Sequence, residues 1–290
     1  MKSIILYGSS EDCCSSQNRL EEMTGQGEIR ILGRSGAPSA EEERWPWIPL
    51  EEFGTQQADY WFLMSRETEK KDRDMLMERL GLSIEQIIPF AVFSLPDMTL
   101  ELYESIRKRK ITVFSNNCYG GLFSHAFRIE NCSPFKNLWL YEHEYLQFLK
   151  NPEYYLSLKP KLKKMTLRKS QYDRLVYPVL SLGGLSIFCN HSRNPFKQIK
   201  KWNERASRVN PDDLIVVFQT SSRAFEDEFY RLDYPHKYCF TDYRSTHEET
   251  IYIPVEEGKD FANTLMNTVA GDNGIYSLTK MILGEKDIRL

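Results

Sequence analysis

Residues 114–127 read FSNNCYGGLFSHAF, and this stretch organises the second half of the chain. An apolar strand ends at Phe114. Two asparagines, a cysteine and two glycines follow at once, and then an apolar segment that contains a histidine. A strand, a tight turn and a helix in this order indicate an α/β fold. The same residue types also suit a catalytic cysteine or a phosphate cradle, so the turn alone does not decide the chemistry.

Strand and helix patterns alternate on both sides of this stretch. In the first hundred residues the pattern predicts strands at 3–7, 28–32 and 59–64, the second ended by Gly33, helices at 17–23 and 67–80, and a closing segment at 84–93. Beyond Pro96 it predicts helices at 99–108, 122–128, 142–149, 195–209, 223–232, 259–269 and 275–283. Strands are expected between them at 111–114, 137–140, 185–189, 214–218, 237–240 and 250–253.

This alternation predicts an α/β protein of two Rossmann-like three-layer domains with mostly parallel sheets. The first is a small N-terminal domain, residues 1–98, and the second is an α/β domain, residues 99–290, which carries the candidate site. An apolar fraction of 41% in 290 residues is enough for two modest cores.

Composition narrows the class of protein. The net charge is −3 and the pI is about 6.0, so there is no global basic field of the kind that binds nucleic acid. No stretch approaches the roughly 20 apolar residues of a membrane span. The first residues, MKSIILYGSSEDCC, contain too few consecutive apolar residues for the core of a signal peptide, and they predict a first strand instead. We therefore predict a cytoplasmic protein.

The six cysteines predict free thiols. None forms a C-x-x-C pair, and no cysteine and histidine spacing suggests zinc. No metal site is predicted, and the sequence identifies no cofactor. In the N-terminal turn YGSSEDCCSS only Gly8 remains of a glycine-rich dinucleotide loop, and Gly33-Arg34 stands where an acidic residue would hold a ribose. A structural or partner-binding role is therefore the better prediction for this domain.

Polar residues follow several of the predicted strands. In an open parallel sheet, ligands bind beyond the carboxyl ends of the strands. If the sheet is parallel, these clusters gather along one edge, although loops after strands are polar in any case. The clusters are Ser115, Asn116, Asn117 and Cys118; Asn190 and His191; Gln219, Thr220, Ser221 and Ser222; and Thr241 and Asp242.

Cys118 and His191 are the candidate catalytic residues. A helix N-terminus lowers the pKa of a thiol, which favours Cys118 as a nucleophile, although many cysteines are simply buried. His125 lies about 10.5 Å further along the same helix at 1.5 Å per residue, so His191 is the better partner. Gly120 and Gly121 would let backbone N–H groups face a phosphate or carboxylate, or they form a plain turn.

Residues 195–209 predict an amphipathic helix with a basic stripe. Lys197, Lys201, Arg205 and Arg208 recur at spacings of four, four and three. The default interpretation is a solvated face. Because the helix begins just after His191, Arg205 and Arg208 are also candidates to hold a diphosphate.

The chain resembles a bacterial family known as domain of unknown function 1919, whose members are often labelled exopolysaccharide-biosynthesis proteins. The resemblance lies in SNNCYGG with His125, SPFKNLWL, LKNPEYYLSL, YPVLSLGGLSIFCNHS and KKWNERASRVNPDDLIVVF. The family commonly has an acidic residue where this chain has Gly183-Gly184. The resemblance implies a setting in surface-glycan assembly but supplies no reaction.

Three functions follow as expectations. The first is a transferase that acts on a nucleotide sugar or glycan precursor, with His191 as base. The domain that carries the candidate site, residues 99–290, has no D-x-D motif for a metal-bound diphosphate, which favours direct stabilisation of the leaving group by cations. The second is a Cys118-dependent acyltransferase or hydrolase with an oxyanion hole from Gly120 and Gly121. The third is a non-catalytic glycan- or nucleotide-binding partner of membrane glycan-assembly machinery. The predicted substrate-binding residues are Ser115, Asn116, Asn117, Gly120, Gly121, His125, Lys201, Arg205 and Arg208.

Overall fold

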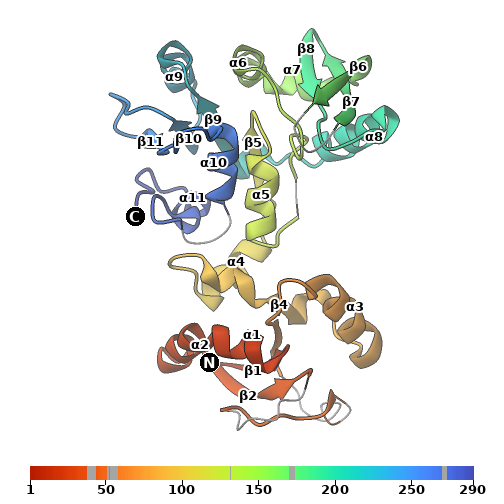
Figure 1. The fold of residues 1–290 in the computed structure, drawn as a ribbon, viewed down its shortest axis with the longest axis vertical. Coiled ribbons are helices and arrows are strands. Elements are labelled where there is room, and N and C mark those ends of the chain that lie inside the picture. The colour runs from red at the N-terminus through yellow and green to blue at the C-terminus, as the bar shows by residue number, and fades with distance from the viewer. Residues whose placement is uncertain (38–43, 51, 53–57, 131, 170–173, 270–272) are drawn as a thin grey trace. The chain divides into compact units, whose positions relative to one another are not determined.

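A computed structural model describes residues 1–290 except 38–43, 51, 53–57, 131, 170–173 and 270–272. The chain divides into unit 1, Met1–Arg107, and unit 2, Lys108–Leu290 (Figure 1). The sequence predicts a boundary after residue 98, whereas helix α4 (Leu100–Arg107) belongs to unit 1. The Leu100 amide donates to Glu28 Oε2 at 2.7 Å, and the Tyr103 ring packs edge-on against Phe93.

Unit 1 is a four-stranded parallel sheet in the order β2-β1-β3-β4. Its strands are short apolar runs that bury almost every side chain in the middle of the sheet. They are β1 (Lys2–Tyr7), β2 (Ile29–Ser35), β3 (Tyr60–Leu63) and β4 (Ile87–Pro89). The helices are α1 (Ser10–Ser15), α2 (Gln17–Gly25), α3 (Glu69–Leu80) and α4, with 3₁₀ turns at Ile84–Gln86 and Phe90–Ser94.

Strand β2 runs two residues past Gly33, where the sequence predicted its end. Gly33 pairs with Ile5 of β1, and the amide of the next residue, Arg34, donates to Pro46 O at 2.9 Å. The Arg34 guanidinium is buried and donates to Gly8 O at 3.0 Å. Arg34 therefore holds the turn after β1, the place where a dinucleotide-binding fold positions its phosphate loop.

Unit 2 contains a second parallel sheet, in the order β11-β10-β9-β5. Its strands, each predicted by a continuous apolar run, are β5 (Thr112–Ser115), β9 (Leu214–Thr220), β10 (Lys237–Thr241) and β11 (Ile251–Tyr252). The helices are α5 (Tyr119–Ala126), α6 (Glu142–Lys150), α7 (Pro152–Ser157), α8 (Pro195–Ala206), α9 (Arg223–Tyr230), α10 (Phe261–Asn267) and α11 (Leu278–Leu283), with a 3₁₀ turn at Pro211–Asp213.

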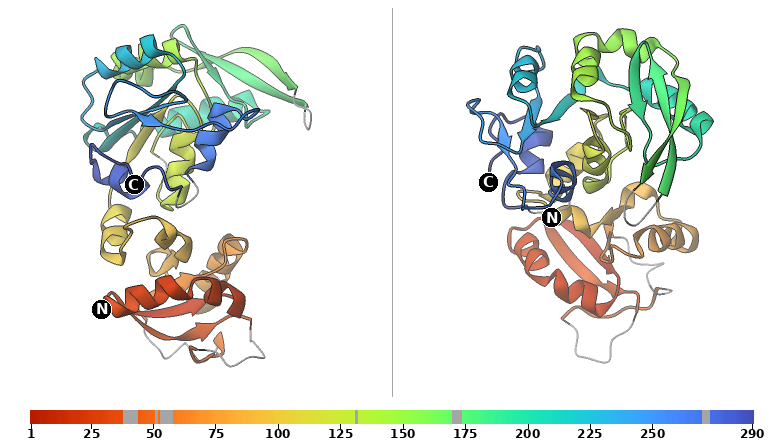
Figure 2. Two further views of the ribbon diagram at one scale, coloured as in Figure 1. Left: turned by 60° about the vertical axis from the view of Figure 1, so that its left-hand side comes forward. Right: turned by 45° about the horizontal axis from the view of Figure 1, so that its top comes forward.

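A third, antiparallel sheet, β6-β7-β8, corrects two of the predicted strands. It consists of β6 (Lys161–Lys169), β7 (Arg174–Leu182) and β8 (Leu185–Phe188), and the long β6–β7 hairpin is drawn in green in Figure 2. The predicted strand 185–189 is β8, which pairs here and not in the parallel sheet. The predicted strand 137–140 is reduced to one bridge between Trp139 and Phe188.

Gly183 and Gly184 form the two-residue turn between β7 and β8. Both have positive φ, 57° and 99°, a conformation that glycine adopts without strain. A Cβ on Gly183 would lie 2.7 Å from Leu158 Cδ1. The tight turn therefore gives a structural reason for these two glycines.

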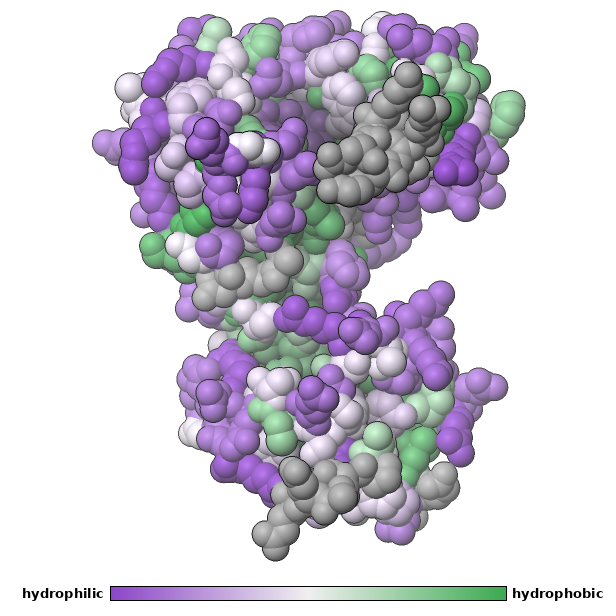
Figure 3. Space-filling view, in the orientation of Figure 1, coloured by the Kyte–Doolittle hydropathy of each residue, from purple (hydrophilic) through white to green (hydrophobic). Residues whose placement is uncertain are grey.

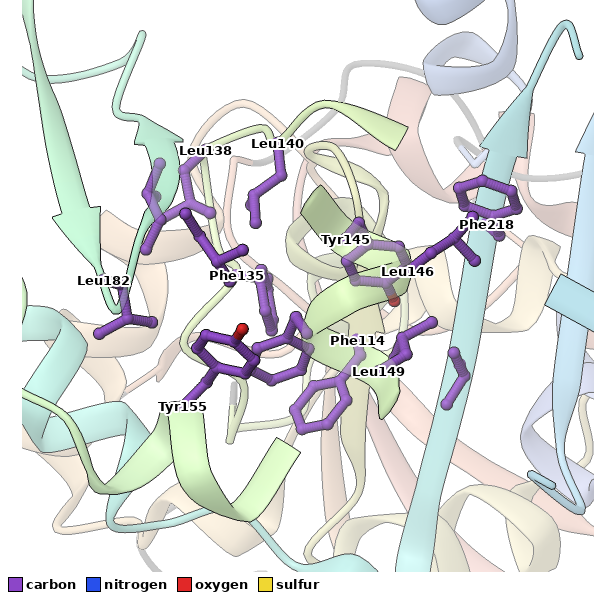
Figure 4. Packing of buried hydrophobic residues seen from close by; sticks show 14 of the residues in the cluster. Phe114, Phe135, Leu138, Leu140, Tyr145, Leu146, Leu149, Tyr155, Leu182 and Phe218 are labelled. Carbon is purple, nitrogen blue, oxygen red and sulfur yellow. The ribbon is translucent and has the colours of Figure 1, made fainter. Parts of the chain in front are cut away.

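The core of unit 2 fixes the parallel sheet and the antiparallel sheet relative to each other. Figure 4 shows Leu182 of β7 on one side and Phe218 of β9 on the other, with Phe135 and Tyr145 between them. The Phe135 ring packs edge-on against Phe148 of α6 with centroids 4.7 Å apart. Each such buried side chain contributes about 1.5–3 kcal/mol. Residues that follow β5 and β8 are thus held in a defined spatial relation.

The surface in view is mostly hydrophilic on both units (Figure 3). Across the described residues, no helix is long and apolar enough to cross a bilayer.

Candidate functional site

The turn after β5 is closed by its own side chains. Ser115 Oγ donates to Asn117 O at 2.8 Å and accepts from the Gly120 amide at 3.1 Å. Asn117 Oδ1 accepts from the Tyr119 amide at 2.9 Å. A Cβ on Gly120 would lie 2.9 Å from Val113 O, which explains the glycine. The first amides of α5 are therefore engaged within the protein and do not form an open phosphate cradle.

Asn116 connects β5 to β9. Its Nδ2 donates to Gln219 O at 2.9 Å, and its Oδ1 accepts from the Gln219 amide at 3.0 Å. The carbonyl of Asn116 accepts from the Leu140 amide at 2.9 Å. Only 6% of Asn116 is exposed, so this predicted substrate-binding residue is a structural link in the protein as it stands. The Asn117 side chain also donates to Gln219 Oε1.

Cys118 and His191 are brought together, as the sequence predicts. Cys118 Sγ lies 3.3 Å from His191 Nε2. Cys118 is the N-cap residue of α5, and His191 lies in the turn that follows β8, closed by the Ser192 amide donating to Cys189 O at 3.0 Å. The histidine therefore reaches the cysteine from the antiparallel sheet, although the prediction assumed neighbouring parallel strands.

Burial raises the pKa of the Cys118 thiol to about 11. At neutral pH Cys118 therefore contacts His191 as a neutral thiol and not as a thiolate. Such a pair reacts when the imidazole takes the thiol proton during attack.

His125 lies away from this pair. It is exposed in the last turn of α5, where its carbonyl accepts from the Arg128 amide at 3.1 Å. Cys118 stands at the opposite end of the same helix, as the spacing predicts. The structure therefore does not bring His125 to the candidate site.

The carboxyl ends of β9 and β10 meet as the sequence expected. Ser221 Oγ donates to Asp242 Oδ2 at 2.8 Å, and the Ser221 amide donates to Glu142 Oε1 at 3.3 Å. The role of Glu142 was not predicted, because it opens helix α6 and follows no regular strand.

Aromatic rings that the sequence analysis did not single out lie next to Glu142. Trp139 stacks on Phe188 with centroids 3.9 Å apart, and Tyr141 packs edge-on against Trp139 at 5.0 Å. Tyr141 is 49% exposed. The signal in the sequence that could have indicated them is the high aromatic content, 13% of the residues.

The basic stripe of α8 separates into two parts. Arg208 forms an ion pair with Glu130. Arg205 is partly buried, and its Nη1 donates to Lys136 O at 3.3 Å. Lys201, one turn earlier on α8, is partly buried as well. Lys136, which lies between α5 and α6, was not predicted as part of the site.

No metal centre is evident in the parts of the chain that the structure describes, where no group of three or more His, Cys, Asp or Glu side chains could hold an ion.

Sequence comparison assigns the family. A family model described as domain of unknown function (DUF1919) matches residues 92–281, well over half of the chain. The chain belongs to the DUF1919 family. The resemblance carried by SNNCYGG and the later motifs is thereby confirmed, and the Cys118–His191 pair lies within the matched residues.

A relative in Haemophilus influenzae is similar to this DUF1919 protein. It carries the description "uncharacterized protein" and is 28% identical over 143 residues. The match covers 48% of this chain and 66% of the relative's own length. The similarity supports a common ancestry and assigns no reaction.

Proposed function

We propose that this DUF1919 protein transfers an acyl group through a covalent intermediate on Cys118, as a step of bacterial surface or extracellular polysaccharide biosynthesis in the cytoplasm. The observation that carries the proposal is the 3.3 Å contact between Cys118 Sγ and His191 Nε2. A nucleophile and a base within hydrogen-bond reach are the minimum for covalent catalysis. The biological setting rests on the label that family members commonly carry.

In the first half-reaction Cys118 Sγ attacks the carbonyl carbon of an activated acyl donor. The thiol proton moves to His191 Nε2 as the sulfur–carbon bond forms. The bond between the acyl carbon and the donor's leaving group then breaks, and the leaving group takes the proton from His191. A thiol with a pKa raised to about 11 needs this base, because almost none of it is thiolate at neutral pH.

In the second half-reaction a hydroxyl of the acceptor attacks the thioester carbon. His191 accepts the hydroxyl proton, the sulfur–carbon bond breaks, and Cys118 recovers the proton. A glycan precursor supplies such a hydroxyl, and with water in its place the same steps give hydrolysis. The exposed Tyr141 ring and the carboxylates of Glu142 and Asp242 suit the apolar face and the hydroxyls of a sugar.

The donors that stabilise the developing oxyanion differ from those the sequence suggested. The Gly120 amide donates to Ser115 Oγ, and the Gly121 amide donates to Cys118 O at 3.1 Å. The side-chain amides of Asn117 and Gln219 are the alternative hydrogen-bond donors, because Asn117 is adjacent to Cys118 and contacts Gln219. Preorganised amides of this kind are common oxyanion donors.

A second candidate function is glycosyl transfer from a nucleotide sugar. The partly buried Lys201 and Arg205 favour it, because two cations are suited to a diphosphate leaving group. In that mechanism His191 deprotonates the acceptor hydroxyl and Cys118 forms no bond. Replacing Cys118 by Ser would then leave most of the turnover intact.

Intact-protein mass spectrometry after incubation with acetyl-coenzyme A tests the proposal. We expect one acetyl adduct on Cys118, absent from Cys118→Ser and formed much more slowly by His191→Ala. Cys14→Ser is the matched control, because Cys14 is an exposed cysteine of unit 1 and its loss should not change the adduct. Full turnover by Cys118→Ser would contradict the covalent step. Ligand binding without an adduct or turnover would favour a non-catalytic binding partner.

A further inference from the structure

Three cations from two segments of unit 2 lie together, and we call Lys136, Lys201 and Arg205 the cation cluster. Lys201 and Arg205 are one turn apart on α8 and so lie on the same helix face. Arg205 Nη1 donates to the carbonyl of Lys136 at 3.3 Å, which brings the segment between α5 and α6 against this face. All three side chains are partly buried.

The positive charge of the cation cluster is offset only in part by a neighbouring carboxylate. Burial lowers the pKa of each of the three side chains. The charge of Arg205 lowers the pKa of both lysines further, and Glu204 offsets part of the effect on Lys201. For Arg205, burial and the charge of Arg208 act in the same direction, and Glu204 offsets only part of the effect.

Two neighbouring cations, Lys200 on α8 and Arg208 just after its end, are instead paired with carboxylates. Among the described residues, the ion pairs of this region join Arg208 to Glu130 and Lys200 to Glu204, and none includes a member of the cation cluster. Holding like charges together at partly buried positions costs free energy, which a bound anion would offset. The cluster is therefore suited to an anionic ligand.

Lys136 of the cation cluster lies against α5, the helix whose N-cap is Cys118. A Cβ on Gly121 would lie 3.2 Å from Lys136 Cγ and 3.3 Å from Asn137 Oδ1. Gly121 follows Cys118 by three residues, and such residues share a face of a helix with Cβ atoms about 5–6 Å apart. Gly121 therefore leaves room for the Lys136 side chain close to the reactive thiol.

We propose that the cation cluster binds the phosphate or diphosphate of the activated donor and so places its transferred group at Cys118. This inference rests on the proposed function, since it defines the donor as a phosphorylated carrier. Two sources share that chemistry, an acyl thioester of a phosphorylated carrier and a nucleotide sugar. The Arg205 guanidinium suits bidentate contact with a phosphate, and the two lysines add point charges.

Calorimetric titration with inorganic pyrophosphate tests the anion site directly. We expect Lys136→Met and Arg205→Gln to weaken binding on the order of tenfold each, the loss expected for a charge-assisted hydrogen bond. Lys201→Gln should act similarly, and because Lys201 forms no side-chain hydrogen bond within the described part of the chain, this variant removes the charge with little structural change. Lys200→Met is the matched control on α8, because its side chain is 78% exposed. Equal affinity in all variants, or no binding by the unmodified protein, would overturn the proposal.

Competition against pyrophosphate separates the two sources of the phosphate. Displacement by acetyl-coenzyme A would assign a carrier thioester, and displacement by a uridine diphosphate sugar would assign a nucleotide sugar. Displacement by neither would overturn the assignment of the cluster to the donor. Cys118→Ser should keep its pyrophosphate affinity. If Cys118→Ser stays active while the cluster variants lose pyrophosphate binding, the proposed covalent step is wrong and the proposed anion site is supported.

Discussion

The loop after β1 in unit 1 and the loop after β5 in unit 2 occupy equivalent places, at the carboxyl end of a parallel sheet. Both lead into a helix, and both carry cysteines near its start. In unit 1 Ser9 and Asp12 hydrogen-bond each other in a capping box, with the Asp12 amide 3.1 Å from Ser9 Oγ. In unit 2 the turn is closed in a similar way, but Cys118 contacts His191.

The difference arises from the antiparallel sheet. Strand β8 is tied to α6 by the Ser186 amide, which donates to Glu144 Oε1 at 2.9 Å, and His191 follows this strand. Unit 1 has a cleft of about 830 Å³ at the same edge of its own sheet, lined by serines, carboxylates, arginines and phenylalanines. The carboxyl edge of a parallel sheet thus supplies a closed turn and, in unit 1, a cleft beside it. In unit 2 the antiparallel sheet adds the candidate base, His191.

The largest expected effect is the loss of activity in His191→Ala. Removing a general base lowers turnover by about 10²- to 10⁴-fold, because the Cys118 thiol then has no proton acceptor. Cys14→Ser in unit 1 is the matched change and should leave the rate unaltered. Single-turnover acyl transfer measures both rates. A comparable loss in Cys14→Ser would remove the functional contrast between the two loops.

The next largest expected effect is a loss of stability, and it tests which asparagine of the β5 loop holds β5 and β9 together. Asn116→Ala leaves the Gln219 amide and carbonyl without their side-chain partner, which should destabilise unit 2 by about 3 kcal/mol. Asn117→Ala removes mainly the acceptor for the Tyr119 amide, a loss of about 1 kcal/mol typical of a helix cap. Hydrogen exchange of β9 peptides measures both. Equal protection in the two variants would mean that Asn116 does not hold the strands together.

Much of this arrangement could be predicted from the sequence. Strands β5, β9 and β10 are continuous apolar runs, and such runs indicate buried parallel strands. The proximity of Cys118 and His191 was also predicted, from the rule that the carboxyl ends of parallel strands meet at one edge. That reasoning reached the correct pair although β8 lies outside the parallel sheet.

The antiparallel sheet was missed for a physical reason. Strand β6 reads KLKKMTLRK, and its apolar side chains Leu162, Met165 and Leu167 are each more than 40% exposed, so no buried apolar face marks the strand. The remaining signal was Gly183-Gly184 between two apolar runs, which is typical of a tight hairpin. Lys136 was not predicted as part of the cation cluster, because it is distant from α8 in sequence.

The pH dependence of Cys118 tests how the pair is protonated. Its pKa of about 11, against 9.0 for an ordinary thiol, lowers the thiolate fraction at neutral pH about a hundredfold. Because the folded-state pKa is raised, the neutral thiol stabilises the fold fully below pH 9, and this contribution is lost as pH rises from 9 to 11. Iodoacetamide alkylation in a Cys14→Ser background should reach half its maximal rate near pH 11. A midpoint below pH 9 would indicate a preformed thiolate–imidazolium pair.

The smallest expected effect lies in unit 1. Ser9→Ala removes the hydroxyl that accepts from the Asp12 amide, and the loss of such a cap costs about 1 kcal/mol. We expect faster hydrogen exchange in α1 and unchanged acyl transfer, because Ser9 has only a structural part in its loop. Ser9→Asp is the matched control, since a carboxylate can accept the same hydrogen bond and should restore protection. A fall in acyl transfer in Ser9→Ala would show that the unit 1 loop takes part in the reaction, and the assignment of the chemistry to the β5 loop and the antiparallel sheet alone would then be wrong.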